Sequence, residues 1–392
     1  MAARKLTVAL LANLKKNAPH LQGEAADAHD DLDSERTVEA LKNSIEAAGF
    51  KCVVLEGNLD IIQPLRKLKP DLAFNICEMH WGDSRESQIP AILEMLRIPY
   101  TGSKLFTMAL SQDKPMTKRV LAYHGLPTPE FQEFARPDEP LDAKLKFPLF
   151  VKPAREGTGM GVDENSIVSN EQELRARVEW VIRAYREPAL VERFIEGREV
   201  TVGIMGNPGP EHSWKTMRNG KPFGGSFDEA ITGGRFHFFP PLEVNFSGYQ
   251  VETKGIYSNL LKTVLGEDYH VLLPAPLEPK QLKELQRLTA ATFQVIGCAD
   301  VARVDFRLDK HDNDKPYILE INPLPGMSPG YSDLCLESES EGIDHVKLVS
   351  GILQLAMRRQ GVTVPAPARV RVPRPERQPV PQAAPQAMPQ PA

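Results

Sequence analysis

The sequence predicts an α/β fold in which an N-terminal parallel sheet is followed by two α+β domains. One observation is the alternation of short apolar runs with helical patterns in residues 1–105. Another is a late pair of strand-like segments, 303–307 and 317–322, in which apolar and polar residues alternate on either side of a charged turn. A length of 392 residues is too great for one compact core and predicts two or three domains.

In the N-terminal region, residues 1–105, the sequence pattern predicts strands and helices in the order βαβαβ. Predicted strands lie at 6–12, 52–55 and 71–76, with helices at 33–48 and 61–68 between them and another at 88–96. Ser34 or Asp33 would cap the first helix. Such alternation is typical of a parallel sheet with helices on both faces. The polar loop 78–87 follows the third strand, at the edge where such sheets bind ligands.

Two α+β units follow. The unit at 106–197 would contain a helix at 111–124, a strand at 147–152, a helix at 170–186 and a strand at 189–195. The unit at 198–360 would contain a strand at 199–204, a helix at 280–295, the late hairpin and a final helix at 342–358. Residues 361–392 are rich in Pro, Ala and Gln and poor in large apolar side chains, so we expect a disordered tail there.

The composition argues against several classes of protein. A hydrophobic share of 41% and a charged share of 25% are those of a soluble globular protein. A net charge of -5 gives no reason to expect a nucleic-acid partner. Cys52, Cys77, Cys298 and Cys335 lie far apart, which argues against a zinc site or a disulfide framework and favours a cytoplasmic protein. No apolar run is long enough to cross a membrane, and the run at 6–12 is too short for a signal peptide.

The late hairpin offers a metal site. As paired strands, its two segments would place Asp305, Glu320 and Asn322 side by side on one face. Three hard oxygen ligands suit Mg²⁺, which shares the rest of its coordination shell with water and substrate phosphates. The alternative for the hairpin taken alone is an ordinary solvated strand face, and the segments upstream favour the metal site.

A glycine-rich loop follows the strand at 147–152. The backbone N–H groups of 157–161 could lie along a polyphosphate, because glycines let the backbone approach phosphate oxygens closely. The loop matches neither of the two best-known nucleotide-binding glycine patterns, and a purely structural turn is the alternative. Lys152 favours phosphate binding, since a buried ammonium at the end of an apolar strand needs an anionic partner. Lys114 opens a helix, where its charge opposes the helix dipole unless an anion lies near.

The strand at 189–195 has an edge that could present backbone groups to a planar base. Glu192 could accept a hydrogen bond from an exocyclic amine, and Glu199 could accept from ribose hydroxyls. Lys254 could be a further cation for phosphate. The alternative is an ordinary edge strand.

Together these segments resemble an ATP-grasp enzyme of the D-alanine–D-alanine ligase-like family. The resemblance covers roughly residues 5–360, and its motifs occur in the expected order. They are Tyr100-Thr-Gly-Ser103, Asp113-Lys114, Val151-Lys-Pro-Ala-Arg-Glu-Gly157, Glu192 with Glu199, Glu252-Thr-Lys254, Arg303-Val-Asp305, and Glu320-Ile-Asn322 with Pro325-Gly326-Met327.

The resemblance implies three domains, with ATP held between the second and third. It implies an ATP-dependent carboxylate–amine ligase of small amino-acid-type substrates, active as a homodimer through an acyl phosphate. Two Mg²⁺ ions would be held by Asp305, Glu320 and Asn322. The nucleotide would contact Lys114, Lys152, Glu156, Gly157, Gly159, Met160, Gly161, Glu192, Arg193, Phe194, Ile195, Glu199 and Lys254. The catalytic residues would be Arg303, Gly326, Glu35, Thr158 and Ser332. Arg303 and the Gly326 N–H would stabilise the oxyanion, and Glu35 would bind the amino group of the first substrate.

The departures from the family pattern lie at the substrate end. The Gly-Gly-x-Ser that follows the first strand in the family is missing, and Cys77 or Glu78 stands in place of a histidine, with His80 near. Gly255 stands where an aromatic residue usually follows the phosphate lysine, and Ser332-Asp-Leu334 approximates a Ser-Leu pair. We therefore expect dipeptide ligation, with D-alanyl-D-alanine as the most familiar product. The rival is the same chemistry on other amino acids or a peptide, and a nucleotide-binding sensor or scaffold without turnover is an alternative of another class.

Overall fold

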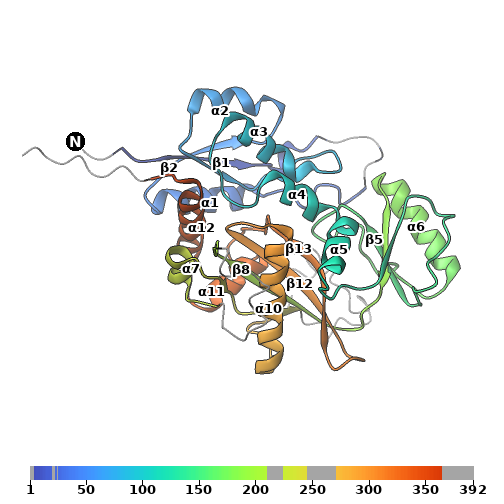
Figure 1. The fold of residues 1–392 in the computed structure, drawn as a ribbon. Coiled ribbons are helices and arrows are strands. Elements are labelled where there is room, and N and C mark those ends of the chain that lie inside the picture. Colours follow the sequence, from blue (N-terminus) through green and yellow to red (C-terminus); the bar gives the residue numbers. More distant parts are fainter. Residues whose placement is uncertain (1–3, 20–22, 24, 210–223, 245–270, 364–392) are drawn as a thin grey trace, which may run out of the picture. The chain divides into compact units, whose positions relative to one another are not determined.

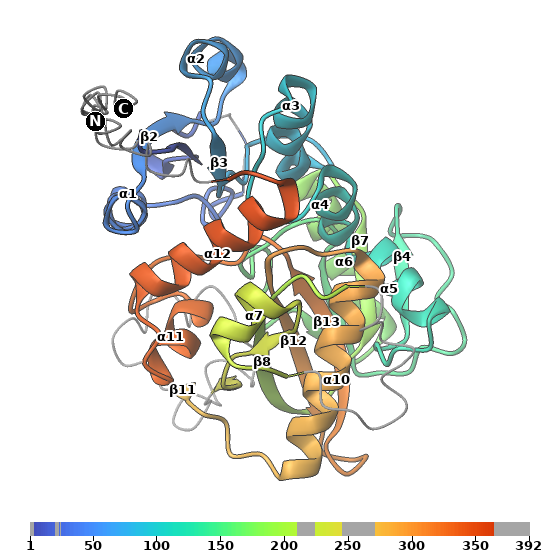
Figure 2. The same cartoon turned by 60° about the vertical axis from the view of Figure 1, so that its left-hand side comes forward.

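Three β-sheets organise the part of the chain that the structure describes, and each is built from its own stretch of sequence (Figures 1 and 2). The computed structural model describes residues 4–19, 23, 25–209, 224–244 and 271–363. The sheets fall within residues 7–75, 131–193 and 197–322. This order of one parallel and two largely antiparallel sheets confirms the predicted α/β fold class.

The first sheet is parallel, as predicted, in the order β2-β1-β3. Its strands are β1 (Thr7–Ala12), β2 (Lys51–Glu56) and β3 (Leu72–Asn75), and a bridge from Ala73 to Tyr100 extends it. Helices α1 (Glu35–Ala47), α2 (Ile62–Leu68) and α3 (Gln88–Leu96) lie close to their predicted positions. The cap of α1 is Ser34, whose side chain accepts a hydrogen bond from the Thr37 N–H at 3.1 Å.

Helices cover both faces of this sheet. Val8 and Leu10 of β1 belong to a core shared with α1 and with α12 (His345–Gln360), whereas Ala9 and Leu11 belong to a core shared with α2 and α3. Alternate side chains of a strand point to opposite faces, so an uninterrupted apolar strand fits a sheet buried on both sides. In Figure 2, α12 lies between the first sheet and the elements of the third.

The second sheet has the order β4-β7-β5-β6. Its strands are β4 (Phe131–Phe134), β5 (Leu149–Pro153), β6 (Ile167–Val168) and β7 (Ala189–Arg193), and α6 (Glu171–Tyr185) packs on it. The helix predicted at 111–124 is instead two helices, α4 (Leu105–Gln112) and α5 (Lys114–Tyr123). They break at Asp113, whose side chain accepts a hydrogen bond from the Met116 N–H at 2.8 Å and so caps α5.

The third sheet has the order β11-β10-β8-β12-β13, with β9 also paired to β8. Its strands are β8 (Gly197–Met205), β9 (His237–Phe238), β10 (Leu242–Val244), β11 (Val271–Leu272), β12 (Val301–Asp309) and β13 (Lys315–Asn322). The predicted antiparallel hairpin is confirmed as β12 and β13. Figures 1 and 2 show α10 (Pro279–Ile296) along this sheet, where its apolar residues pack on those of β8, β12 and β13.

Shorter elements complete the described chain. Helix α7 (Phe227–Gly233) and helix α11 (Asp333–Ser340) both contact α12, and 3-10 turns lie at Lys15–Asn17, Leu59–Ile61 and Arg85–Ser87. Residues 5–363 form one compact unit. From residue 364 on, the predicted tail lies outside the described residues. No helix among the described residues is long and apolar enough to cross a membrane.

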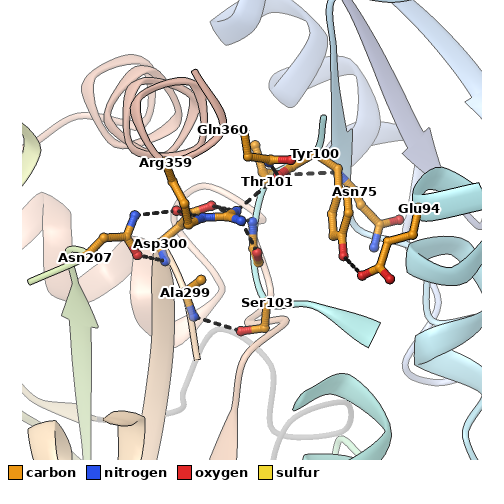
Figure 3. A network of polar contacts seen from close by, with 11 residues as sticks. Asn75, Glu94, Tyr100, Thr101, Ser103, Asn207, Ala299, Asp300, Arg359 and Gln360 are labelled. Atoms are coloured by element: carbon orange, nitrogen blue, oxygen red, sulfur yellow. Dashed lines mark hydrogen bonds and ion pairs between the residues drawn. The ribbon is translucent and has the colours of Figure 1, made fainter. Parts of the chain in front are cut away.

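A buried ion pair ties the end of α12 to the loops beside β3 and β12 (Figure 3). The Asp300 carboxylate, which is fully buried, accepts hydrogen bonds from Arg359 Nη2 at 2.7 Å, from the Gly102 N–H at 2.8 Å and from Asn207 Nδ2 at 2.7 Å. Arg359 also donates to the carbonyl oxygens of Tyr100 and Gly102. Each charged group therefore has an opposite charge and further hydrogen-bond partners beside it, which a buried ion pair in a low-dielectric interior requires.

We predict that Arg359→Ala lowers the free energy of unfolding by about 3–5 kcal/mol, because it leaves the Asp300 carboxylate buried without a cation. Urea unfolding measures the change. The matched control is Arg358→Ala, which removes an exposed arginine from the same turn of α12 and should cost less than about 0.5 kcal/mol. Equal losses in the two variants would contradict the role given to this pair.

Candidate active site

One cavity of about 520 Å³ brings together most of the predicted site residues. Its lining comes from the second and third sheets and from loops that flank the first. The predicted residues that line it are Lys114, Lys152, Glu156, Gly157, Thr158, Gly159, Met160, Glu192, Arg193, Phe194, Ile195, Glu199, Arg303, Asp305, Glu320, Asn322, Gly326 and Ser332.

The third sheet gives this cavity a polar wall. On β12, Val304 and Phe306 pack into the core with α10, while Arg303, Asp305 and Arg307 line the cavity. This division follows from the alternation of side chains along a strand, as the alternating apolar and polar residues at 303–307 predicted.

A bulge in the hairpin enlarges this wall. Asp305 pairs with Glu320, but Phe306 pairs with Ile318, so Leu319 is an extra residue in β13. As a result Leu319 and Glu320 both line the cavity, while Ile318 stays in the core. The sequence pattern gave no sign of this shift.

The predicted magnesium ligands lie together on the polar wall. Asn322 Nδ2 donates to Asp305 Oδ2 at 2.8 Å, and Glu320 is the cross-strand neighbour of Asp305. Arg303 donates two hydrogen bonds to the Asp305 carboxylate, at 2.9 and 3.1 Å. Two carboxylates and an amide oxygen are the hard donors that Mg²⁺ prefers, so the donor set fits such an ion beside a phosphate. In this structure Arg303 contacts the Asp305 carboxylate, and Lys114 lies 3.5 Å from the Glu320 carboxylate.

Glu192 lines the cavity and lies between two lysines. Its carboxylate is 2.8 Å from Lys118 Nζ and 3.2 Å from Lys152 Nζ, and all three side chains are buried. Burial alone would raise the pKa of Glu192, but the two ammonium groups outweigh it and lower that pKa. Burial likewise would lower the pKa of Lys152, and the carboxylates of Glu192 and Glu320 reverse the effect. Glu192 thus holds Lys152 in the charged state that phosphate binding needs.

The glycine loop takes a conformation that few other residues tolerate. Gly159 and Gly161 have φ of 77° and 69°, in the left-handed region. A Cβ on Gly161 would lie 2.5 Å from Pro153 Cγ, so this glycine is also required by packing. Gly161 is the one predicted member of the loop that does not line the cavity among the described residues. Its N–H instead donates to Asp27 Oδ2 at 2.8 Å, which ties the loop to the chain before α1.

Lys114 links the glycine loop to the polar wall. Its Nζ donates to the Glu156 carbonyl and lies 3.5 Å from Glu320 Oε2. A cation that contacts both the loop and a predicted metal ligand is well placed for the charge of a phosphate chain.

Apolar side chains on β5, directly after β7 and on β13 line the cavity. The rings of Phe150 and Phe194 stack with centroids 6.3 Å apart, and Leu319 lines the same cavity. Arg307 pairs with Glu199 at 2.8 Å. This combination suits a flat apolar group with a polar edge, such as a purine with its ribose.

Arg303, Gly326 and Ser332 all line the cavity. Arg303 Nη1 lies 3.2 Å from Asp333 Oδ2, at the first residue of α11. A Cβ on Gly326 would lie 2.7 Å from Ser332 Oγ, so glycine permits this close approach. Ser332 Oγ accepts a hydrogen bond from the Ser328 N–H at 3.0 Å, which fixes the loop that carries both residues.

Loops flanking the first sheet add an acidic portion of wall. The sequence indicates Glu78 and the loop 78–87 there, but it does not place Asp30, Asp31 or Glu86 at the site. Asp30, Asp31, Glu78 and Glu86 line the cavity, and buried Arg85 pairs with Asp31 at 2.8 Å. Burial raises the pKa of Glu78 well above its usual range. Burial also raises the pKa of Glu86 to about 7, although Arg85 and Lys114 oppose the shift.

Several predicted residues lie elsewhere. Glu35 is exposed, pairs with Lys16 and does not line the cavity. Cys77 is buried in the core with α2 and α3, so Glu78 is the residue at that position that lines the cavity. His80 is also absent from the lining. Lys254 and Gly255 lie outside the described residues.

Some of the missed residues had a signal in the sequence. Lys118 lies four residues after Lys114 on α5, a spacing that places two side chains on the same helix face. Arg85 and Glu86 belong to the loop 78–87 that was expected at the ligand-binding edge. Their approach to Asp31 had no signal in the sequence, because it depends on two distant loops coming together.

The arrangement of the sheets is that of the ATP-grasp fold. A crystal structure of D-alanine–D-alanine ligase from Bacillus anthracis complexed with ATP superposes with a TM-score of 0.63 at 20% identity, covering 91% of this chain and 99% of that one. A likeness at that identity concerns the fold.

The sequence comparisons define the family. The sequence pattern of the D-ala D-ala ligase C-terminus family matches residues 120–220 and 239–354. A D-alanine–D-alanine ligase of Pelotomaculum thermopropionicum is 31% identical over 337 residues, which are 83% of this chain and 93% of that protein. Another, of Syntrophotalea carbinolica, is 32% identical over 325 residues, with shares of 83% and 92%. The chain belongs to the D-alanine–D-alanine ligase family.

We predict that Glu86→Gln stabilises the ligand-free protein at pH 8 more than at pH 5. The pKa of Glu86 is raised in the folded state, so folding takes up a proton between its ordinary value and about 7, and stability falls as the pH rises through that window. Glutamine cannot ionise and removes this loss. Partial exposure of Glu86 reduces the gain at pH 8 to about 1 kcal/mol.

Urea unfolding at both pH values measures the difference. Glu179→Gln, which removes one exposed carboxylate from α6, is the control and should behave like the unmodified protein at both. The account of Glu86 fails if Glu86→Gln destabilises the protein at pH 8 or acts equally at the two pH values.

Proposed function

We propose that this protein is an ATP-dependent ligase that joins a carboxylate to an amine through an acyl phosphate. The observation that carries the proposal is the single cavity in which the glycine loop and Lys152 face the hairpin carboxylates Asp305 and Glu320. The family's named members, which are D-alanine–D-alanine ligases, support the same reaction class.

In this proposal ATP lies between the second and third sheets. Its base would rest against Phe150, Phe194 and Leu319, and its ribose against Glu199. Lys114, Lys152 and the N–H groups of the glycine loop would bind the phosphates and offset their charge. Asp305, Glu320 and Asn322 would hold magnesium, which when bound neutralises phosphate charge and orients the transferring phosphoryl group.

In the first step of the proposed reaction, the carboxylate of one substrate attacks the γ-phosphate of ATP, which forms an acyl phosphate and releases ADP. In the second step, the amine of the other substrate adds to the acyl carbon, its nitrogen loses a proton, and phosphate leaves as the amide forms. Arg303 and the Gly326 N–H would donate to the oxyanion that develops between these events. For this, Arg303 must turn from its contacts with Asp305 and Asp333 toward the substrate.

D-alanine is the first amino-acid substrate to test, because named relatives are D-alanine–D-alanine ligases. Glu78 and the acidic residues around it favour the rival, a ligase of other amino acids.

We further propose a cytoplasmic homodimer. Free cysteines support the compartment, since Cys52, Cys77 and Cys335 are buried thiols and Cys298 is partly buried. The dimer rests on family resemblance, and light scattering tests it.

Phosphate release from ATP over a panel of D- and L-amino acids, with products identified by mass, tests the reaction. An amide product that requires ATP is the expected result. ATP binding without an amide product from any pair would favour a non-catalytic nucleotide-binding protein and overturn the proposal.

We predict that Glu320→Gln lowers turnover by a factor of about 100 or more, because it removes a charged ligand from the proposed magnesium site. Glu179→Gln should leave turnover unchanged, and circular dichroism should show both variants folded. Turnover retained in folded Glu320→Gln would show that this carboxylate does not hold the metal.

A further inference from the structure

The part of the cavity wall that flanks the first sheet is dominated by negative charge. Asp30 and Asp31 come from the loop before α1, and Glu78 and Glu86 come from the loop after β3. Glu156, at the start of the glycine loop, lines the same cavity. Five carboxylates therefore share one wall with few cations.

The cations of the protein satisfy only part of this wall. Arg85 Nη2 contacts both Asp31, at 2.8 Å, and Glu156, at 2.9 Å. Lys15 pairs with Asp30 at 2.6 Å. Among the residues that the structure describes, Glu78 and Glu86 form no ion pair, and burial raises the pKa of both carboxyl groups. A bound cation would supply the missing partner.

A second feature of the wall points to a ligand independently of charge. Gln112, at the end of α4, is 4% exposed and lines the cavity. Its Oε1 accepts a hydrogen bond from the Glu86 N–H at 3.3 Å, while its Nε2 has no hydrogen-bond partner among the described residues. A buried amide donor left unsatisfied costs roughly 1–3 kcal/mol, so an acceptor on a ligand would be favoured there.

We propose that one substrate of this protein is a basic amino acid, held by Glu78 and Glu86 through its cationic groups and by Gln112 through its carboxylate. This inference rests on the proposed function for the site. A neutral amino acid such as alanine brings one amine to the wall, whereas lysine, ornithine or arginine brings two cationic groups. Two carboxyl groups that form no ion pair with any described residue, beside an unsatisfied amide donor, match the second kind of ligand.

Calorimetric titration of the full chain tests the proposal with ligands matched in shape. Lysine is compared with norleucine, arginine with citrulline, and lysine with cadaverine, which lacks the carboxylate. Both enantiomers are used, with and without magnesium and ADP. We expect lysine or arginine to bind at least about tenfold more tightly than its neutral partner, and lysine more tightly than cadaverine.

Variants assign the effect to this wall. Glu78→Gln and Glu86→Gln should each weaken binding of the basic amino acid about tenfold. The variant that removes the partner of the side-chain cation should leave norleucine and citrulline binding unchanged, because these ligands lack that cation. Glu179→Gln, on the surface of α6, is the matched control and should bind like the unmodified protein. Thermal unfolding checks that each variant is folded, and the charge-conserving Glu86→Asp should restore part of the affinity if Glu86→Gln is unstable.

Equal binding of norleucine and lysine, equal binding of cadaverine and lysine, or full affinity in both glutamine variants would overturn this inference. So would the absence of basic amino-acid binding both with and without the nucleotide. The test separates this inference from the proposed function. ATP-dependent amide formation from neutral amino acids alone would sink the inference and keep the ligase. Binding of a basic amino acid without ATP-dependent amide formation would do the reverse.

Discussion

The site depends on one constraint in the third sheet, whose two faces meet opposite environments. The face of β8, β12 and β13 toward α10 is apolar and buried, and the face toward the cavity carries arginines and carboxylates. Strand alternation makes this division automatic in β12. In β13 the bulge at Leu319 adjusts it so that the core stays apolar while Glu320 remains beside Asp305. The proposed metal ligands are therefore positioned by the packing of α10 on the other side of the sheet.

The charges that line the cavity mostly satisfy one another. Glu192 is paired with two lysines, Asp305 with Arg303, and Glu199 with Arg307. Buried charges are tolerable in this form because each has an opposite partner within hydrogen-bond reach. Binding of an anionic nucleotide with its metal would exchange some of these contacts, since phosphate takes the lysines and the metal takes the carboxylates. In the acidic wall, Glu78 and Glu86 form no ion pair with any described residue, which sets these two carboxyl groups apart from the rest of the lining.

The buried ion pair of Asp300 and Arg359 connects the elements that support the cavity. It joins α12 to the loop at Tyr100 and Gly102, next to β3, and to the start of β12. The acidic wall comes from loops around the first sheet, and the polar wall with the proposed magnesium ligands comes from β12 and β13. Asp300 therefore connects the supports of both walls, although it does not line the cavity itself.

The sequence by itself determined the parallel first sheet, the β12–β13 hairpin, the glycine loop with Lys152, and the identity of the residues on the polar face of β12. These features are local. The apolar periods of strands and helices, and the glycines that a tight loop requires, can be recognised in short stretches of sequence. The sequence also left a choice between Cys77 and Glu78, and it suggested Glu35 for the substrate amine. Only the tertiary structure buried Cys77, exposed Glu35, paired Lys118 with Glu192 and brought Arg85, Asp31 and Glu86 to one wall. Such contacts join residues far apart in the chain, and the packing of sheets and loops decides them because no local period encodes the distance between two loops.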